Sequence, residues 1–532
     1  MSAPSAAISE ANSRAPSHQI AIPSLYISGE QISPLDDYKN AFPLWTILRD
    51  CYAGELRIKS KGETYLRRPS NVDKSNYETY LSRAYFYNAT RRTHTGLLGS
   101  MMRKNPEVTL PTNLNVNLAN FTIDGMSFVE FTRKICHEVL LVGRFGILTD
   151  IPDTPGIVPQ PYAAGYAAES IFRPRYSVIN GRRVLDRIIL RERKITNTEY
   201  SRTETDLYRI LRLDPDPNTG KMVYSQTIIK PAVGTSEVES VTQRKILIQG
   251  RQLDYIPFVF VNTTNILPEI EDPNLIDIAT LNLSHYESTA LLEHGRFYAG
   301  MPTYYIADGE EGGGNGDLAD GLGSPEPMSV GPSNVWLLGK GAKAGLLEFN
   351  GHGLTFLENA VDSKQLQMQS LGGKFIPAQQ KSAALSTEAY GLMEAGDEAS
   401  LLSIALTAER ALKLTLDYMN DLQNNLVANN GTVELNKEFV RSEMTAREIS
   451  ALRALYESRM IPLDVMYYSL RQIGVIPMEY TLGDFKTLME TPSQLYSDPT
   501  VQPIPGGPIY NPADPADPRN KPKLPLNNGT ED

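Results

Sequence analysis

The sequence predicts an α+β fold, and three stretches of different periodicity lead to that prediction. Apolar residues recur at helical spacing through residues 36–141. Residues 170–265 instead hold short β-branched or alternating runs separated by turn residues, which indicates an antiparallel sheet or an array of hairpins. Helical patterns return at residue 274 and continue, with interruptions, to residue 488.

Three helices are expected before the strands, over residues 42–52, 76–104 and 127–141. Asn105-Pro106 helps to end the second of them, because the residue before a proline is disfavoured in a helix. The strand candidates that follow are separated by turn signals such as the Pro- and Gly-containing residues 214–220. They lie at residues 183–195, 206–214, 222–230, 245–250 and 256–262.

The second half of the chain predicts two helices around an insert. A helix started by Asn274 should run to residue 300. The insert is loop-like, with short strand candidates at 335–338 and 345–349. The returning helix, 354–371, carries a mostly apolar face, formed by Leu357, Val361, Lys364, Met368 and Leu371.

After a break at 372–386, a very long helical pattern begins at Thr387 and is closed by Asn429, Asn430 and Gly431. A strand candidate and further helices follow, up to residue 488. The last 41 residues contain 10 prolines, so we expect them to be extended rather than packed.

Length and composition set the broad class. A chain of 532 residues is too long for one compact core and corresponds to roughly three units. There is no uninterrupted apolar run of about 18 residues, so we expect no membrane-spanning helix and no membrane partner. Residues 1–35 have neither a basic start nor an apolar stretch, which predicts a flexible arm rather than a secretory signal. Cys51 and Cys136 lack metal-type spacing, which favours a reducing compartment.

The formal net charge of −11 bears on nucleic-acid binding. A protein that grips duplex DNA usually carries clustered basic charge that displaces counterions. If DNA is a partner of this chain, we therefore expect weak contact or sliding rather than tight holding.

The sequence offers no catalytic motif. Gly339-Lys340 is followed by Gly341, and Gly373-Lys374 by Phe375, so neither pair belongs to a nucleotide-binding P-loop. The six histidines are scattered and lack zinc-ligand spacing. No nucleophile elbow is present. We therefore expect neither enzymatic activity nor a cofactor or metal.

The order of these segments resembles the portal proteins of tailed bacteriophages. Three strings carry the likeness: residues 80–108 (YLSRAYFYNATRRTHTGLLGSMMRKNPEV), residues 379–402 with Ser386-Thr387-Glu388-Ala389 and Ser400-Leu401-Leu402, and residues 438–477. The resemblance spans about residues 36–491 and leaves out the N-terminal arm (1–35) and the Pro-rich tail (492–532). It implies a wing of helices and then antiparallel strands (36–270), a first stem helix (271–300), a β-containing clip (301–353), a second stem helix (354–371), a tunnel loop (372–386), a long helix returning to the wing (387–439) and a helical crown (440–491).

The resemblance implies that the chain forms a ring at one vertex of a virion capsid, and this ring is a dodecamer in the family. It also implies assembly in the host bacterial cytoplasm. The ring would serve DNA packaging, retention and ejection. Its partners would be the major capsid protein, the terminase large subunit, a head-completion adaptor or tail protein, and double-stranded DNA in passage. Lys364, Lys374 and Lys381 are the candidates for weak contact with that DNA, although each is equally well explained as a solvated surface lysine. Another neck or tail protein of a virion, or an enzyme of unfamiliar type, are the alternatives.

Overall fold

The computed structural model describes residues 25–27, 30–32, 34–70, 73–110, 114–152, 160–231, 238–248, 251–300, 303–307, 343–347, 352–372, 387–423, 431–437, 439, 446–472, 475–476 and 480–490. Contacts divide the chain into two units, Met1–Phe439 and Val440–Asp532. Helices and antiparallel strands both contribute, so the predicted α+β class is confirmed.

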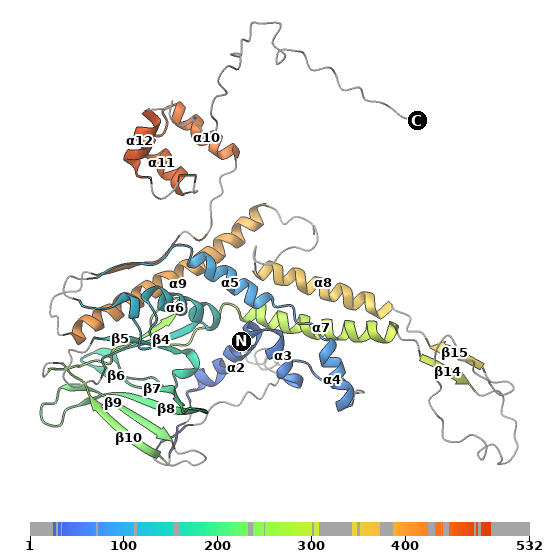
Figure 1. Cartoon of the computed structure of the whole chain (residues 1–532), viewed down its shortest axis with the longest axis horizontal. Helices are drawn as coiled ribbons and strands as arrows, with labels where there is room; N and C mark the ends of the chain where they lie inside the picture. The colour runs from blue at the N-terminus through green and yellow to red at the C-terminus, as the bar shows by residue number, and fades with distance from the viewer. Residues whose placement is uncertain are drawn as a thin grey trace, which may run out of the picture. The chain divides into compact units, whose positions relative to one another are not determined.

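The first unit contains nearly all of the described secondary structure (Figure 1). Its helices are α2 (Asp36–Ala53), α3 (Glu55–Ser60), α4 (Lys74–Arg83), α5 (Ala89–Met101), α6 (Phe128–Val142), α7 (Ile276–Gly300), α8 (His352–Gly372) and α9 (Thr387–Leu422), with 3-10 turns η1 (Gly62–Thr64), η2 (Leu118–Asn120) and η3 (Ala168–Ser170). Its strands are β1 (Leu25–Ile27), β2 (Glu30–Ile32), β3 (Glu107–Thr109), β4 (Arg144–Asp150), β5 (Tyr162–Ala167), β6 (Arg175–Ile179), β7 (Arg182–Asn197), β8 (Arg202–Pro215), β9 (Met222–Pro231), β10 (Val238–Lys245), β11 (Leu247–Ile248), β12 (Arg251–Gln252), β13 (Phe258–Asn262), β14 (Thr303–Ala307), β15 (Lys343–Leu347) and β16 (Thr432–Glu434).

A five-stranded antiparallel sheet in the order β10-β9-β8-β7-β6 forms the strand-rich part. Each strand pairs with its neighbour in the chain, as the alternating runs and turn signals predicted. Two of the predicted runs do not join this sheet. The run at 245–250 overlaps only the last residue of β10 and includes β11, which pairs with β12. The run at 256–262 is β13, which pairs with β4 in a three-stranded sheet of order β13-β4-β5. Both faces of β13 and β4 are buried, which explains why their central residues, Phe145–Leu148 and Phe258–Val261, are not polar on either face.

The main core lies among α2, α5, α6, α7 and α9, where Trp45, Phe131 and Leu412 are fully buried. The start of α6 is fixed by a capping box: Ser127 accepts from the backbone N–H of Glu130, whose carboxylate in turn accepts from the N–H of Ser127. Gly143 ends the helix with φ 78°, a left-handed conformation that suits glycine, and β4 begins immediately after it.

The single helix predicted over 76–104 is wrong. The structure holds two helices there, α4 and α5, separated by an extended turn at residues 84–88. Asn88 is the N-cap of α5, because its side-chain oxygen accepts from the N–H of Arg91. The carbonyl of Tyr87 is held by the side chain of Asn282 at 2.6 Å. Local capping and a distant partner on α7 therefore override a continuous apolar pattern.

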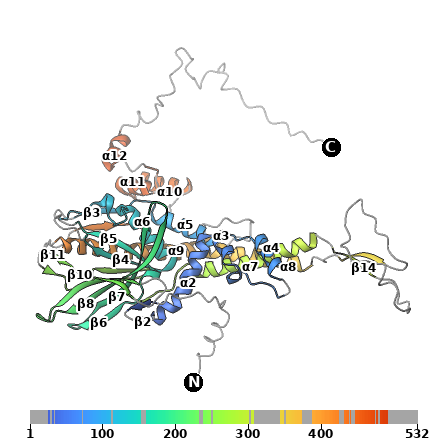
Figure 2. The ribbon, with the colours of Figure 1, turned by 60° about the horizontal axis from the view of Figure 1, so that its bottom comes forward.

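Helices α7 and α8 run side by side and lead away from the rest of this unit, with the β14–β15 hairpin at their far end (Figures 1 and 2). Their bounds, 276–300 and 352–372, lie within two residues of the predicted 274–300 and 354–371. Asn274, predicted to start the first of them, donates its amide to Ser400 Oγ on α9. The strand candidate at 335–338 lies outside the described residues, and the candidate at 345–349 overlaps β15.

The second unit contains α10 (Ala446–Glu457), α11 (Leu463–Gln472) and α12 (Leu482–Glu490). Tyr467, Leu470 and Ile476 form its small core. The hydroxyl of Tyr467 donates to the carbonyl of Tyr480 at 2.6 Å, which ties α11 to the start of α12. The helices expected here are present; the tail from 492 lies outside the described residues.

Candidate functional site

The first candidate is the two-helix hairpin, which consists of α7, α8 and the β14–β15 pair. The sequence predicts this arrangement of two helices around an insert, and its resemblance to portal proteins relates the arrangement to their stem and clip. At about 1.5 Å rise per residue, the 25 residues of α7 and the 21 of α8 form rods roughly 37 and 31 Å long. The two strands at their end pair antiparallel, from Thr303 with Leu347 to Ala307 with Lys343.

Close packing joins the two rods. A Cβ placed on Gly295 of α7 would lie 2.6 Å from Cδ2 of Leu354 on α8, so a larger side chain at this position would require the Leu354 side chain to move. Arg296 donates to Glu358 across the seam at 2.9 Å and to Glu293 on its own helix at 2.8 Å. Because these side chains are about half-exposed, the ion pairs fix register more than they add stability.

Lys364 lies within this seam. It shares the α8 face with Leu357 and Met368, and its ammonium donates to the carbonyl of Ser284 at 3.0 Å and to Ser288 Oγ at 2.6 Å, both on α7. Burial lowers the pKa of this ammonium, and the carboxylate of Glu287 opposes that effect. The structure thus places Lys364 as a link between the two helices. Its predicted contact with DNA stays a prediction, and it would require these bonds to be released.

Burial changes along the hairpin. The last buried residue of α7 is Leu292, and on α8 only Met368 and Gly372, at the end near the core, are buried among the described side chains. Beyond them, large apolar side chains face outward: Phe356 is 77% exposed and Tyr298 is 54% exposed. Leu291, Leu366 and Leu371 are also exposed. Among the described residues, the hairpin therefore presents an apolar surface that is left uncovered.

The charge of the hairpin is acidic. Helices α7 and α8 together carry five carboxylates, Asp277, Glu287, Glu293, Glu358 and Asp362, against the two basic residues Arg296 and Lys364. The other two lysines predicted to contact DNA, Lys374 and Lys381, lie outside the described residues.

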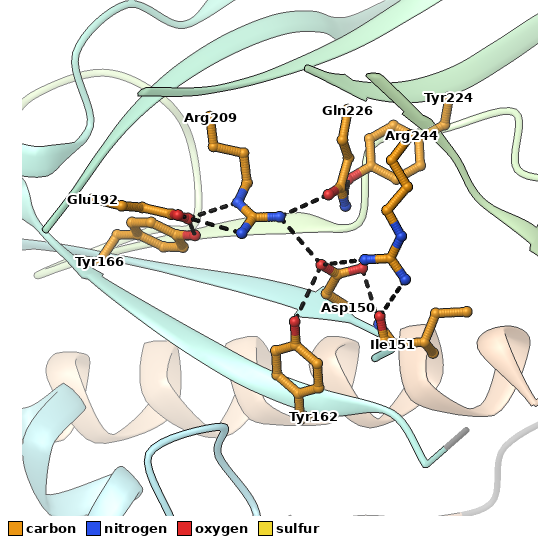
Figure 3. A network of polar contacts seen from close by, with 9 residues as sticks. All are labelled: Asp150, Ile151, Tyr162, Tyr166, Glu192, Arg209, Tyr224, Gln226 and Arg244. Carbon is orange, nitrogen blue, oxygen red and sulfur yellow. Dashed lines mark hydrogen bonds and ion pairs between the residues drawn. The ribbon is translucent and has the colours of Figure 1, made fainter. Parts of the chain in front are cut away.

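A second candidate is a buried polar network between the two sheets, which the sequence did not predict (Figure 3). Asp150, at the end of β4, is 1% exposed. Its carboxylate is approached by Arg209 of β8 at 3.4 Å, Arg244 of β10 at 3.5 Å and the hydroxyl of Tyr162 on β5 at 3.3 Å. Arg244 also donates to the carbonyl of Ile151 at 2.5 Å.

Arg209 extends the network to a second carboxylate. Its Nε donates to Glu192 of β7 at 2.6 Å, and its Nη1 donates to the amide oxygen of Gln226 on β9 at 2.7 Å. The hydroxyl of Tyr166 donates to the same carboxylate of Glu192 at 2.5 Å. Two guanidinium groups are thus matched by two carboxylates, with tyrosine and amide groups completing their hydrogen bonds.

This balance indicates a structural joint. Burial raises the pKa of Asp150, and the nearby Arg244 and Arg209 oppose that rise. A network whose charges are all paired rigidifies the contact between sheets and leaves no carboxylate or amine available to act on a substrate. The signal for it in the sequence is weak: single charged residues in otherwise apolar strands, whose partners lie up to 94 residues away.

In the described part of the chain, no three His, Cys, Asp or Glu side chains gather as a metal site would require. Both cysteines are buried, and burial raises their thiol pKa values, so they are poor nucleophiles. Among these residues, no helix is both long and apolar enough for a bilayer crossing.

A family described as a domain of unknown function (DUF4055) matches residues 274–422, from just before α7 to the end of α9. No curated protein matches the sequence.

Three solved structures share 13% identity with this chain. One described as the virion of a native gene transfer agent (GTA) particle covers 76% of this chain and 94% of its own, with a TM-score of 0.34. The neck of an empty GTA particle, computed with C6 symmetry, covers 74% and 92%, with a TM-score of 0.35. The neck of a native GTA particle, computed with C12 symmetry, covers 69% and 84%, also at 0.35. Chains this dissimilar need not share an activity, and the functional proposal therefore rests on the residues of this chain.

Proposed function

We propose that this chain is a structural component of the head or neck of a tailed-phage-like particle and, more specifically, that it forms the portal ring of that particle. The observation that carries the proposal is the acidic hairpin of α7 and α8, with its uncovered apolar side chains and its β14–β15 pair at the far end. The coarser proposal requires only assembly into a particle. The finer one requires a closed ring with an axial channel.

A pair of packed helices leaves part of its own surface uncovered, which favours assembly with further copies. Each helix of an antiparallel pair buries one face against the other, and its opposite face needs either solvent or a further partner. Phe356 and Tyr298 are poor side chains to leave in solvent. A second copy that seats its hairpin beside the first covers them, and a head-to-tail contact of this kind closes into a ring when its rotation is right.

The charge of the hairpin supports a channel through which DNA moves freely. If the helices line an axial opening, their surplus of carboxylates repels the phosphate backbone. Passing DNA then meets no deep binding well, which suits packaging, retention and ejection. Basic side chains at a constriction would centre the duplex, and Lys374 and Lys381 remain the proposed residues.

The proposed partners follow from this assignment: the major capsid protein around the ring, a terminase large subunit that supplies the energy for packaging, and an adaptor or tail protein at the β14–β15 end. The absence of a P-loop in the sequence agrees with a motor located on another protein.

Negative-stain images of the full-length protein test the proposal. Rings with an axial hole are expected. Filaments or irregular particles would contradict the portal ring but not a structural role in a particle. Isolated monomers at micromolar concentration would contradict both.

The lysine prediction has its own test in infected cells. Lys374→Glu combined with Lys381→Glu should leave ring assembly intact and reduce the DNA content per particle, because the positive ring that centres DNA is reversed. Full-length genomes in normally stable particles would show that these lysines take no part in DNA handling.

A further inference from the structure

Three arginines lie next to one another across the five-stranded sheet. The register pairs Arg175 of β6 with Arg187 of β7, and Arg187 with Arg212 of β8. Residues directly opposite on antiparallel strands share a face, and their side chains are neighbours at about 5 Å. Ser225 of β9 follows Arg212 in the same row. Like charges placed directly opposite destabilise a sheet, so the arrangement needs an explanation beyond packing.

Only the first of these arginines has a close acidic partner. Arg175 holds Asp186 through Nε at 2.9 Å and Nη2 at 2.7 Å, and Ser177 donates to the same carboxylate. The Nε atoms of Arg187 and Arg212 are buried and have no hydrogen-bond partner among the described residues. Both side chains are partly exposed, so solutes can reach the guanidinium tips.

The electrostatics of Arg187 agree with this geometry. Its pKa is lowered first by burial and then by the positive charges of Arg175 and Arg212, while the carboxylates of Asp214 and Asp186 act in the opposite direction. Three cations therefore face two anions, and one of those anions is already taken up by Arg175. The row holds a net positive charge in a chain whose net charge is −11.

We propose that Arg187 and Arg212 form a binding site for a phosphate group. Adjacent strands lie about 4.8 Å apart, so two neighbouring guanidinium groups can donate to different oxygens of one tetrahedral anion. The hydroxyl-bearing Ser225 lies next in the row and offers a further donor. A phosphate fits this pair better than a carboxylate does. In the same row, the single carboxylate of Asp186 pairs with the single arginine Arg175. Two adjacent arginines can donate to more oxygens than a carboxylate has, and a phosphate offers more oxygens and more charge.

The phosphate can belong to a nucleic-acid backbone or to a free ion, since both present the same oxygens to the two guanidinium groups. The site lies on the sheet of the first unit and involves neither α7 nor α8 (Figure 1). It therefore stands or falls independently of the ring proposal.

Equilibrium dialysis of the full-length protein against labelled inorganic phosphate, at fixed ionic strength in chloride, tests the proposal. We expect saturable binding that becomes weaker by at least about tenfold in Arg187→Gln/Arg212→Gln. In Arg193→Gln it should be unchanged, because that arginine lies on the same strand, is 62% exposed and already pairs with Glu204. Asp214→Asn should bind phosphate more tightly, because a neighbouring negative charge is removed.

The same dialysis with a short DNA duplex as competitor distinguishes the two sources. If the duplex displaces phosphate from the wild-type protein, and the double variant also binds the duplex more weakly, the site binds a nucleic-acid backbone. If the duplex does not displace phosphate, the site binds a free phosphate. Thermal melting in chloride shows whether the double variant is folded. Its melting temperature should be at least that of wild type, because the repulsion between Arg187 and Arg212 is removed. Phosphate binding that is absent in wild type or equal in the double variant overturns the proposal. Binding of an acidic peptide but not of phosphate overturns it in favour of a carboxylate.

Discussion

The two halves of α7 differ in how deeply they are buried. From Ile278 to Leu292 the helix is embedded among α2, α4 and α5, and Tyr286 and Ala290 are fully buried. From Glu293 to Gly300 no residue of the same helix is buried, and among the described residues Arg83 at the end of α4 packs over Phe297 in this part. The first half is buried among helices of its own unit, whereas the second half is the part that the proposed ring would cover with another copy. The predictions below test this contrast.

The largest expected effect is in the embedded half. Tyr286→Ala should lower the free energy of unfolding by about 3–5 kcal/mol, since it removes a buried ring that packs edge-on against Phe86. Urea denaturation followed by circular dichroism measures the loss. The matched control is Tyr286→Phe, because the hydroxyl of Tyr286 has no hydrogen-bond partner among the described residues. That variant should be as stable as wild type within about 0.5 kcal/mol. Equal losses in both variants would show that the hydroxyl, not the ring, stabilises this part.

Acid should weaken the embedded part as well. Burial lowers the pKa of His94 and of His285 to about 4, below the ordinary value of 6.5. A group whose pKa is lower in the folded state contributes stability above the unfolded value and loses it as pH falls from about 6.5 towards 4. Each histidine should cost about 2 kcal/mol at pH 5 relative to pH 7. His94→Gln should remove roughly half of that pH dependence, and an unchanged slope of stability with pH would contradict the assignment.

Removing Lys364, which links α7 and α8, should lower stability by less than the changes in the buried part do. Lys364→Met keeps most of the aliphatic stem and removes the hydrogen bonds to Ser284 and Ser288, so it should cost about 1 kcal/mol. Gln367→Met is the control, because Gln367 lies on the exposed face of α8. Hydrogen exchange of α8 amides is the measurement. Faster exchange in Gln367→Met than in Lys364→Met would mean that Lys364 does not hold the helices together.

Much of the fold could be predicted from local signals. The capping box at Ser127 and Glu130 and the glycine at 143 define α6, and apolar periodicity places α7 and α8 to within two residues. In the main sheet, β7, β8 and β9 were predicted, whereas β6 and β10 were not. The polar sequence of β10 hides its alternation. Local patterns failed at Asn88, where a cap and the distant Asn282 split an apparently continuous helix.

The functional parts depended on long-range pairing, which a single sequence does not reveal. Lys364 falls on an apolar stripe, yet its hydrogen-bond partners on α7 lie 76 and 80 residues earlier. The network around Asp150 joins strands whose neighbours are fixed only by register. The same holds for Arg187 and Arg212, which become neighbours only when β7 and β8 pair.

Native mass spectrometry of the full-length protein, compared with a variant of the hairpin, tests the central claim most directly. Wild type should form one closed assembly of many identical subunits. Tyr298→Ser/Phe356→Ser should shift it to monomers while changing the free energy of unfolding of the monomer by less than about 0.5 kcal/mol, because both side chains are exposed within the chain. Leu56→Ser, which alters an even more exposed apolar residue on α3, should assemble as wild type does. A wild-type protein that remains monomeric or dimeric at micromolar concentration, or a hairpin variant that assembles fully, would contradict the claim that the outer half of α7 and its partner α8 are completed by another copy of the chain.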